Sequence, residues 1–529
     1  MTLHRAAPSG HGPIEVGPDG RPPATGRIEL PDLRNLPPFG SEESTAGPEP
    51  APSGSRVAKL ARKASWNLAD QVITAATNTL LFIVLARSVS KGRLDAFTNA
   101  FYIFTLMIGI GRALVGQVLS VRFSDSEGAP WRTALRQAFG FIVAITLAAS
   151  AVIAGVGLLV DGPLHQSLLA LAVVLPALIM QDACRNAFFA QSQAKQAALN
   201  DGLWAVIQFG AIAALIHFGH ADVGYLVLAW GGGAAVCVLL ALTQLRVVPD
   251  LRAAPAWIRR SWNLSRFFLA ENLLTSGAFT GGFLIVGAMV GEGAVSAIRG
   301  AQVLVGPLET LSSAMFTFTL PELARRSWLS VRTRWKIATA ASAAMLTVAL
   351  AYTAVLWLMP DDVGRLIFRA NWDGPSTVLL PIALGSAAAR ACLGPAVTIY
   401  AMGMARRTFK LMTVEAPLVL SLMLGGAAVG GVVGAAWGLA ANQALLIPLW
   451  FLTLRSILRL PPEALAAESL LHDDHDTPDT AGTPGSPDTA ALPVLDGSGR
   501  PIQPRHAAFG SLPLPPGAGP ARGRHTRNR

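Results

Sequence analysis

The chain has 529 residues, of which 52% are hydrophobic and only 14% charged, and its formal net charge is +10. Soluble domains typically carry about 25% charged residues, so this composition excludes an ordinary soluble globular protein. In a soluble protein the basic excess would suggest a nucleic-acid partner, but here the basic residues gather between alternate apolar segments. The positive-inside rule of membrane proteins explains that distribution, and we expect no nucleic-acid partner.

Long apolar segments predict transmembrane helices. Each segment has roughly 20 residues, enough to cross a hydrocarbon layer about 30 Å thick, in which the backbone has to be helical. In chain order the twelve expected helices cover 66–86, 97–121, 133–160, 167–189, 197–218, 223–245, 263–290, 295–320, 335–359, 377–402, 409–430 and 433–455. The predicted fold class is therefore all-α, a polytopic membrane protein with about 12 transmembrane helices.

The loops between these helices differ in charge on the two sides of the membrane. Arginine and lysine are frequent before the first helix, after every second helix and after the last one. The loops at 161–166, 219–222 and 431–432 hold neither residue. This asymmetry predicts a multi-pass protein of the cell membrane with both termini in the cytoplasm.

Two segments outside the helices have a different composition. Residues 1–55 and 460–529 are rich in proline, glycine and alanine and lack apolar patterning, which predicts two disordered cytoplasmic tails. The N-terminus has no apolar stretch typical of a cleaved signal peptide, so we expect the first helix to direct insertion. The three cysteines have no metal-like spacing, and no nucleotide-binding loop is found; we expect no metal, no cofactor and no enzymatic activity.

The sequence SWNL occurs twice, at 65–68 and 261–264, each time just after a pair of basic residues. The second helix of each half also carries an arginine followed by L-V-G, in GRALVGQ and IRGAQVLVGP. An internal repeat with six helices per copy keeps one orientation, which is a parallel repeat. We therefore predict an N-lobe at 56–246 and a C-lobe at 247–459, joined by a basic linker near 246–260. SWNL is interpreted as the cytoplasmic start of each lobe.

Four stretches of the sequence resemble a known family. They read ADQVITAATNTLLFIVLARSVS, IGIGRALVGQVLSVR, QDACRNAFFAQSQAKQAALNDGLW and GVVGAAWGLAANQ. They are similar to actinobacterial polysaccharide export proteins of the multidrug/oligosaccharidyl-lipid/polysaccharide (MOP) exporter superfamily. The resemblance implies two six-helix lobes around a V-shaped cavity, alternating access, and a polyprenyl-diphosphate-linked glycan as cargo. Lipid II flippases of this superfamily are similar too, but usually carry two further helices.

Polar residues at helical spacing mark the candidate site. An ionised side chain near the bilayer centre costs about 2.5–3.5 kcal/mol on insertion scales, so it normally faces a cavity or a partner. The candidate substrate-binding residues are Asn78, Arg112, Arg185, Asn272, Arg299, Gln302 and Arg390, and the candidate ion-coupling residues are Asp70, Glu271 and Glu309. Arginines suit a diphosphate because their planar fork binds it bidentately, while amides replace the hydration of sugar hydroxyls.

Structural roles for the same residues stay open. The alternatives are a snorkelling Arg112, a pair between Arg299 and Glu271 or Glu309, an ion pair between Asp182 and Arg185, and a capping or interfacial Asp70. Gly426, Gly430, Gly434 and Gly438 recur every four residues, which favours close helix packing and a turn between the last two helices.

The leading hypothesis is a flippase for a lipid-linked oligosaccharide in cell-surface polysaccharide assembly. Its partners would be the lipid-linked glycan, the bilayer, a coupling ion (H⁺ or Na⁺) and polysaccharide assembly proteins. A cation-coupled multidrug antiporter of the same fold is the alternative, with Asp70 or Glu271 as its ion site. A lipid II flippase and a membrane scaffold that acts through its tails are further alternatives.

Overall fold

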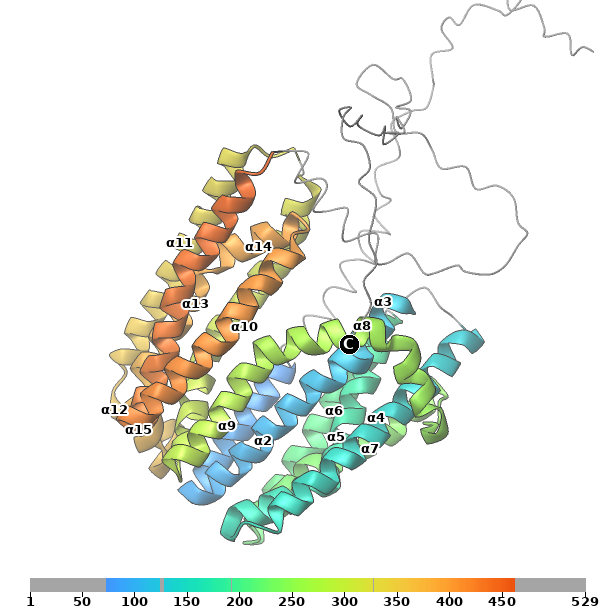
Figure 1. Cartoon of the computed structure of the whole chain (residues 1–529). Helices are drawn as coiled ribbons and strands as arrows, with labels where there is room; N and C mark the ends of the chain where they lie inside the picture. The colour runs from blue at the N-terminus through green and yellow to red at the C-terminus, as the bar shows by residue number, and fades with distance from the viewer. Residues whose placement is uncertain (1–72, 124–127, 192, 327, 462–529) are drawn as a thin grey trace, which may run out of the picture. The chain divides into compact units, whose positions relative to one another are not determined.

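The computed structural model describes residues 73–123, 128–191, 193–326 and 328–461. Both predicted tails, the candidate Asp70 and the first SWNL copy lie outside the described residues. Within the described part every regular element is a helix (Figure 1). The predicted all-α fold class is therefore confirmed.

The first half of the chain contains the helix Ile73–Ser88, α2 (Lys91–Gly111), the π-helical η2 (Arg112–Gly116), α3 (Gln117–Arg122), α4 (Gly128–Gly157), α5 (Gly162–Ala190), α6 (Ala194–His217) and α7 (Val223–Leu245). The second half contains η3 (Leu251–Ala253), α8 (Ala254–Asn272), the π-helical η4 (Leu273–Gly277), α9 (Ala278–Val290), α10 (Ala294–Arg325), α11 (Val331–Trp357), α12 (Asp361–Phe368), η5 (Arg369–Trp372), α13 (Asp373–Ala391), α14 (Leu393–Ala401) and α15 (Ala405–Leu458).

Ten helical stretches of the described residues are long and apolar enough to cross a membrane, which makes this a multi-pass membrane protein. The difference from the expected twelve arises at two places. The helix Ile73–Ser88 is shorter than the others and begins where the described residues begin. The two last predicted helices form one element, α15, which is broken at Gly430 and Gly431. The count of twelve therefore stays a prediction.

The break in α15 depends on glycine. Gly431 has a φ of +59°, a left-handed conformation that glycine adopts without steric cost. A Cβ atom on Gly434 would lie 2.0 Å from the carbonyl oxygen of Gly426, and one on Gly438 would lie 2.1 Å from that of Leu422. The two limbs of α15 thus pack backbone to backbone, and both predictions for the glycine repeat, close packing and a turn, are confirmed.

We expect Gly434→Ala to destabilise the fold by about 1–3 kcal/mol, because the added methyl group would push the two limbs apart. Gly425→Ala is the matched control, since nothing lies within 4 Å of its added Cβ. The measurement is the thermal unfolding temperature of each purified variant in detergent. Equal unfolding temperatures for the two variants would show that the limbs do not pack this closely.

The predicted orientation can be tested on two exposed loop residues, His220 and Ser330. We expect a cysteine at 220 to react with a membrane-impermeant maleimide added to intact cells. A cysteine at 330 should react only after permeabilisation. The native Cys184, Cys237 and Cys392 are buried, so their background reaction should be low. External labelling at 330 would overturn the orientation.

Residue contacts divide the chain into two compact units. Unit 1 consists of Met1–Thr310, Ala351–Ser386 and Glu415–Asn442, and unit 2 consists of Leu311–Leu350, Ala387–Val414 and Gln443–Arg529. The division cuts α10, α11, α13 and α15. It does not follow the predicted boundary between residues 246 and 247, and the two-lobe organisation stays a prediction.

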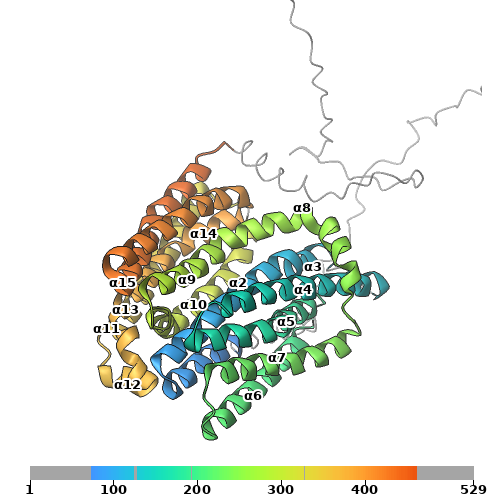
Figure 2. The same cartoon turned by 60° about the horizontal axis from the view of Figure 1, so that its bottom comes forward.

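Within unit 1, α5 packs against α2, α4 and α7 (Figure 2). Its apolar side chains are buried along most of the helix. Trp230 of α7 fills the space beside α2, with its ring 4.8 Å from that of Phe104 and 5.6 Å from that of Phe97. Such aromatic pairs contribute about 0.5–1.5 kcal/mol beyond their buried area. This core fixes α2, which continues into η2 with Arg112, and α5, which carries Arg185.

The structure corrects the predicted linker at 246–260. The Asp250 side chain accepts a hydrogen bond from the Arg252 backbone amide at 3.1 Å, and α8 begins four residues later, at Ala254. Trp257 is buried, and its Nε1 donates to the carbonyl oxygen of Leu114 in η2 at 3.2 Å. The start predicted at 263 was wrong, and the second SWNL copy lies inside α8. Periodicity missed these turns because their apolar face is interrupted by basic residues.

Candidate functional site

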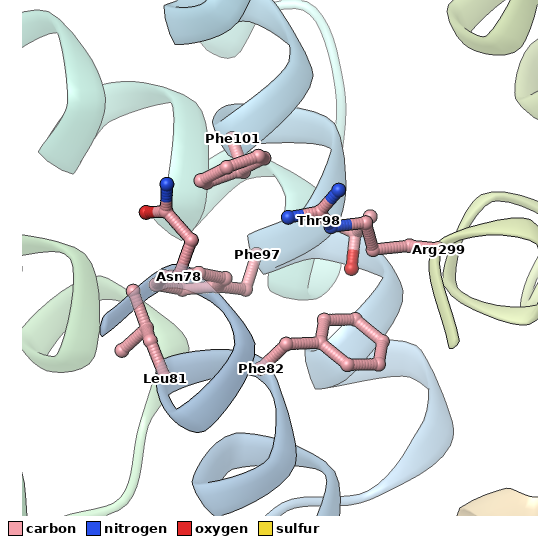
Figure 3. A pocket seen from close by; sticks show the side chains of 7 residues that line it. All are labelled: Asn78, Leu81, Phe82, Phe97, Thr98, Phe101 and Arg299. Carbon is pink, nitrogen blue, oxygen red and sulfur yellow. The ribbon is translucent and has the colours of Figure 1, made fainter. Parts of the chain in front are cut away.

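Two candidate substrate-binding residues, Asn78 and Arg299, line one hollow in unit 1 (Figure 3). The other lining residues are Leu81, Phe82, Phe97, Thr98 and Phe101. Arg299 extends from α10 between residues of the first helix and α2, and its guanidinium carbon lies 4.7 Å from the centroid of the Phe101 ring. The space inside the hollow is only about 10 Å³. A cavity needs roughly 10–15 Å³ to hold one water molecule, so in this conformation the side chains fill the hollow and leave no room for a glycan.

Arg299 has an aromatic partner and no acidic one. Among the residues that the structure describes, no carboxylate lies within ion-pair distance of its guanidinium, and it forms neither of the pairs with Glu271 and Glu309 that the sequence left open. A cation over a ring gains about 0.5–2 kcal/mol, less than the cost of holding the charge in an apolar segment. The guanidinium therefore keeps its capacity to bind an anion.

Gln302, one turn beyond Arg299, is held by α2. Its Oε1 accepts a hydrogen bond from the Tyr102 hydroxyl at 2.8 Å, and the Tyr102 ring stacks on that of Phe283. Asn272 also lies against α2: a Cβ on Gly109 would lie 2.5 Å from the Asn272 Oδ1 atom. That buried oxygen has no hydrogen-bond partner among the described residues. An amide oxygen without a partner has hydrogen-bonding capacity for a ligand.

Arg112 belongs to a different cluster, on the first-half helices. Its Nε lies 2.9 Å from Asp182 Oδ2 and its Nη2 lies 2.6 Å from Asp182 Oδ1, a bidentate pair. The Asp182 side chain is 7% exposed, and Asn186 donates a further hydrogen bond to it. This ion pair balances the charge of Arg112, so the side chain does not need to snorkel to the membrane surface. Because Asp182 occupies one edge of the guanidinium, Arg112 is less suited to an anion than Arg299.

Arg185 forms a second pair in the same region. Its Nε lies 3.1 Å from Asp201 Oδ2, and the two side chains are 10% and 7% exposed. Gln181 donates to the other Asp201 oxygen at 2.6 Å, and the Arg185 guanidinium lies over the Phe189 ring. Asp182 and Arg185 therefore bind partners on other helices, Arg112 and Asp201, and not simply each other as the i, i+3 spacing suggested.

The remaining candidates lie elsewhere. Arg390 is buried in unit 2, where its Nη1 donates to the Ser312 hydroxyl at 2.8 Å. Glu271 is half-buried on α8, and Glu309 is exposed on α10. Asp70 precedes the described residues. The predicted set is thus distributed over a hollow, an ion-pair cluster and unit 2.

Sequence reasoning missed two acidic residues, Asp95 and Asp201. Asp95 is buried, and its Oδ1 accepts a hydrogen bond from the Ser296 backbone amide at 2.9 Å, so it caps the first turn of α10. The helix predicted from residue 97 left Asp95 in a loop, whereas α2 begins at Lys91. An acidic residue close to an apolar run was the available signal in both cases. In the described ranges no group of three or more potential metal ligands occurs.

Comparison with known proteins places this geometry in a known fold. No family model matches the sequence, and no curated protein matches it. Among solved structures, the lipid II flippase MurJ in an inward closed conformation aligns with a TM-score of 0.59 at 12% identity, over 78% of this chain and 93% of that chain. An inward-facing multidrug resistance MATE family transporter of the MOP superfamily aligns with a TM-score of 0.57 at 14% identity, over 77% of this chain and 96% of that chain.

The chain has the fold of these membrane transporters. A MATE structure in complex with MaL6 aligns similarly, with a TM-score of 0.53 at 14% identity over 77% of this chain and 96% of that chain. The resemblance inferred from the residues is therefore supported at the level of the fold. At 12–14% identity a shared fold does not identify the cargo, so the cargo class has to be argued from the side chains.

Proposed function

We propose that the chain is a flippase that moves a polyprenyl-diphosphate-linked oligosaccharide across the cytoplasmic membrane by alternating access, for cell-surface polysaccharide assembly. The observation that carries this proposal is Arg299, a half-buried arginine in an apolar helix with no acidic partner among the described residues. A diphosphate offers the bidentate acceptor that a guanidinium fits best. The lipid tail would stay in the bilayer.

The charges favour an anionic cargo over the alternative, a cation-coupled multidrug antiporter. Arg112 and Arg185 are balanced by Asp182 and Asp201, so these pairs leave little net charge. Arg299 adds a positive charge to the hollow and would repel an organic cation. The multidrug antiporter is therefore our second candidate and a lipid II flippase our third.

Other residues receive supporting roles in this proposal. Asn78, Gln302 and Asn272 supply amides for sugar hydroxyls, which cost kcal/mol-scale free energy when they are desolvated without a partner. Arg112 is a secondary contact through the half-exposed part of its side chain, and Arg185 and Arg390 each stabilise helix packing within their own unit. Asp70, Glu271 and Glu309 stay candidates for H⁺ or Na⁺ coupling. No chemical step on the cargo is proposed.

Reconstitution into vesicles tests the function directly. Vesicles would contain a polyprenyl-diphosphate-linked oligosaccharide in both leaflets, and an impermeant sugar-modifying reagent would be added outside. With the protein present, we expect the protected inner-leaflet fraction to become accessible. The matched control lipid carries the same sugar without the diphosphate and should stay protected. Ion-driven movement of a cationic dye with no movement of the glycan lipid would support the antiporter instead.

A further inference from the structure

The segment 361–372, which comprises α12 and η5, contacts the end of the first described helix. Asn371 Nδ2 lies 2.7 Å from the carbonyl oxygen of Ala86 and 3.0 Å from that of Val89, and it donates to both. These residues are 285 and 282 positions apart in the sequence. All of them lie in unit 1. A side chain from the second half of the chain therefore caps the C-terminal end of a helix in the first half.

The helix Ile73–Ser88 needs such a partner. The last four carbonyl groups of a helix have no intrahelical donor, and a following glycine commonly turns the chain so that they are satisfied locally. Here Val89 and Ser90 follow, and α2 begins at Lys91, so the chain has no glycine in this turn. The Asn371 amide takes over that role from a distant part of the chain.

Further contacts join the same two segments. Arg87 Nη1 donates to the carbonyl oxygen of Leu366, and Arg369 Nη1 donates to that of Arg87. The Phe368 ring meets the Phe82 ring edge-on, with centroids 6.2 Å apart. Phe82 also lines the hollow that contains Arg299. The segment thus contacts both the end of the first helix and one wall of the candidate site.

The segment is held in shape by its own side chains. Trp372 Nε1 donates to Asp361 Oδ1 at 2.9 Å, and the Trp372 ring stacks on Phe368. Gly364 permits this, because a Cβ there would lie 2.1 Å from the Trp372 ring. Arg369 has a φ of +53°, a strained conformation for a residue other than glycine, which turns the chain toward Asn371. Because these contacts lie within the segment, they hold Asn371 and Phe368 in fixed positions, and the two side chains form one preformed surface.

We propose that segment 361–372 is a latch that holds the first helix against the second half of unit 1 and thereby keeps the Arg299 hollow closed to the outer side. Opening toward that side would break the two Asn371 hydrogen bonds and separate Phe368 from Phe82. The latch assumes the alternating access of the proposed function, but it does not depend on the cargo. Its first test, a labelling experiment, therefore needs no cargo.

The test is labelling of a cysteine at Thr98, a buried residue of the hollow, by an impermeant maleimide added to intact cells. Asn371→Asp keeps the side-chain shape but removes both N–H donors. We expect labelling about tenfold faster than with Asn371 intact, because two hydrogen bonds of ordinary net strength are lost. Asp222→Asn is the control: it weakens an exposed ion pair with Arg93 that lies within the first half. Equal labelling in the Asn371→Asp and Asn371 proteins would overturn the latch.

A second variant covers the case in which Asn371→Asp fails to fold. Cysteines replacing Ala86 and Asn371 should form a disulfide on oxidation in membranes, because the Asn371 amide lies 2.7 Å from the Ala86 backbone carbonyl oxygen in the closed latch. The closed bridge should stop transport, and a reductant should restore it. Transport at an undiminished rate with the bridge closed would overturn the latch. If the intact protein moves no glycan lipid, the proposed function fails, and the labelling result still decides on the latch.

Discussion

Replacing Arg185 by leucine is expected to lower the free energy of unfolding by about 3–5 kcal/mol, since it leaves a buried carboxylate without its counter-charge. The carboxylate is that of Asp201, whose side chain is 7% exposed. Gln181 and Thr74 would still donate hydrogen bonds to it, but uncharged donors cannot balance a full charge. Loss of folded protein from the membrane should accompany the loss of stability.

The second variant in this experiment is Arg185→Leu combined with Asp201→Asn. It removes both charges. Replacing a buried ion pair by uncharged groups often changes the free energy of unfolding little, so most of the stability should return. Arg93→Leu is the control, because its pair with Asp222 is 42% and 44% exposed and should contribute at most about 1 kcal/mol. Unfolding of the purified variants in detergent is the measurement. Equal losses for Arg185→Leu and Arg93→Leu would show that the first pair is not buried.

The positions of the helices could be predicted from the sequence because the bilayer imposes a length and a composition on each of them. The helix predicted at 223–245 has those bounds in the structure. The helix predicted from 263 failed, because the first turns of α8 are amphipathic and bind the first-half helices through Trp257. Hydropathy identifies segments that face lipid, and it does not detect a helix that packs on protein through a few side chains.

The partners of the charged residues could not be predicted. Arg112 and Asp182 are 70 positions apart, and only the packing of η2 on α5 brings them together. Helical spacing gives the face on which a residue lies and does not identify the neighbouring helix. The π-helical η2 adds a second reason, because a π-bulge shifts the phase of every later side chain on the helix. The helical spacing by which the candidate residues were chosen assumed one regular period.

Arg299 is the residue on which the cargo class depends. If its guanidinium holds the diphosphate, Arg299→Ala should reduce export at least about tenfold, because charge-assisted hydrogen bonds contribute about 1.5–3 kcal/mol each. Arg299→Lys keeps the charge but loses the planar fork, so we expect partial activity. The alanine variant should fold normally, since among the described residues no carboxylate pairs with Arg299. Arg112→Ala is less informative, because it would leave Asp182 without its partner.

The measurement is the accumulation of lipid-linked glycan in the cytoplasmic leaflet of cells that express each variant at the same level. Phe101→Leu is the matched control: it removes the ring under the guanidinium and leaves the charge in the hollow. We expect it to export almost normally, because a cation–π contact contributes only about 0.5–2 kcal/mol and the diphosphate would replace it. A structural Arg299 that merely rests on the ring predicts instead that both variants are similarly mild. Normal export by Arg299→Ala would remove the diphosphate assignment and, with it, the main reason to prefer an anionic lipid-linked cargo over a cationic drug.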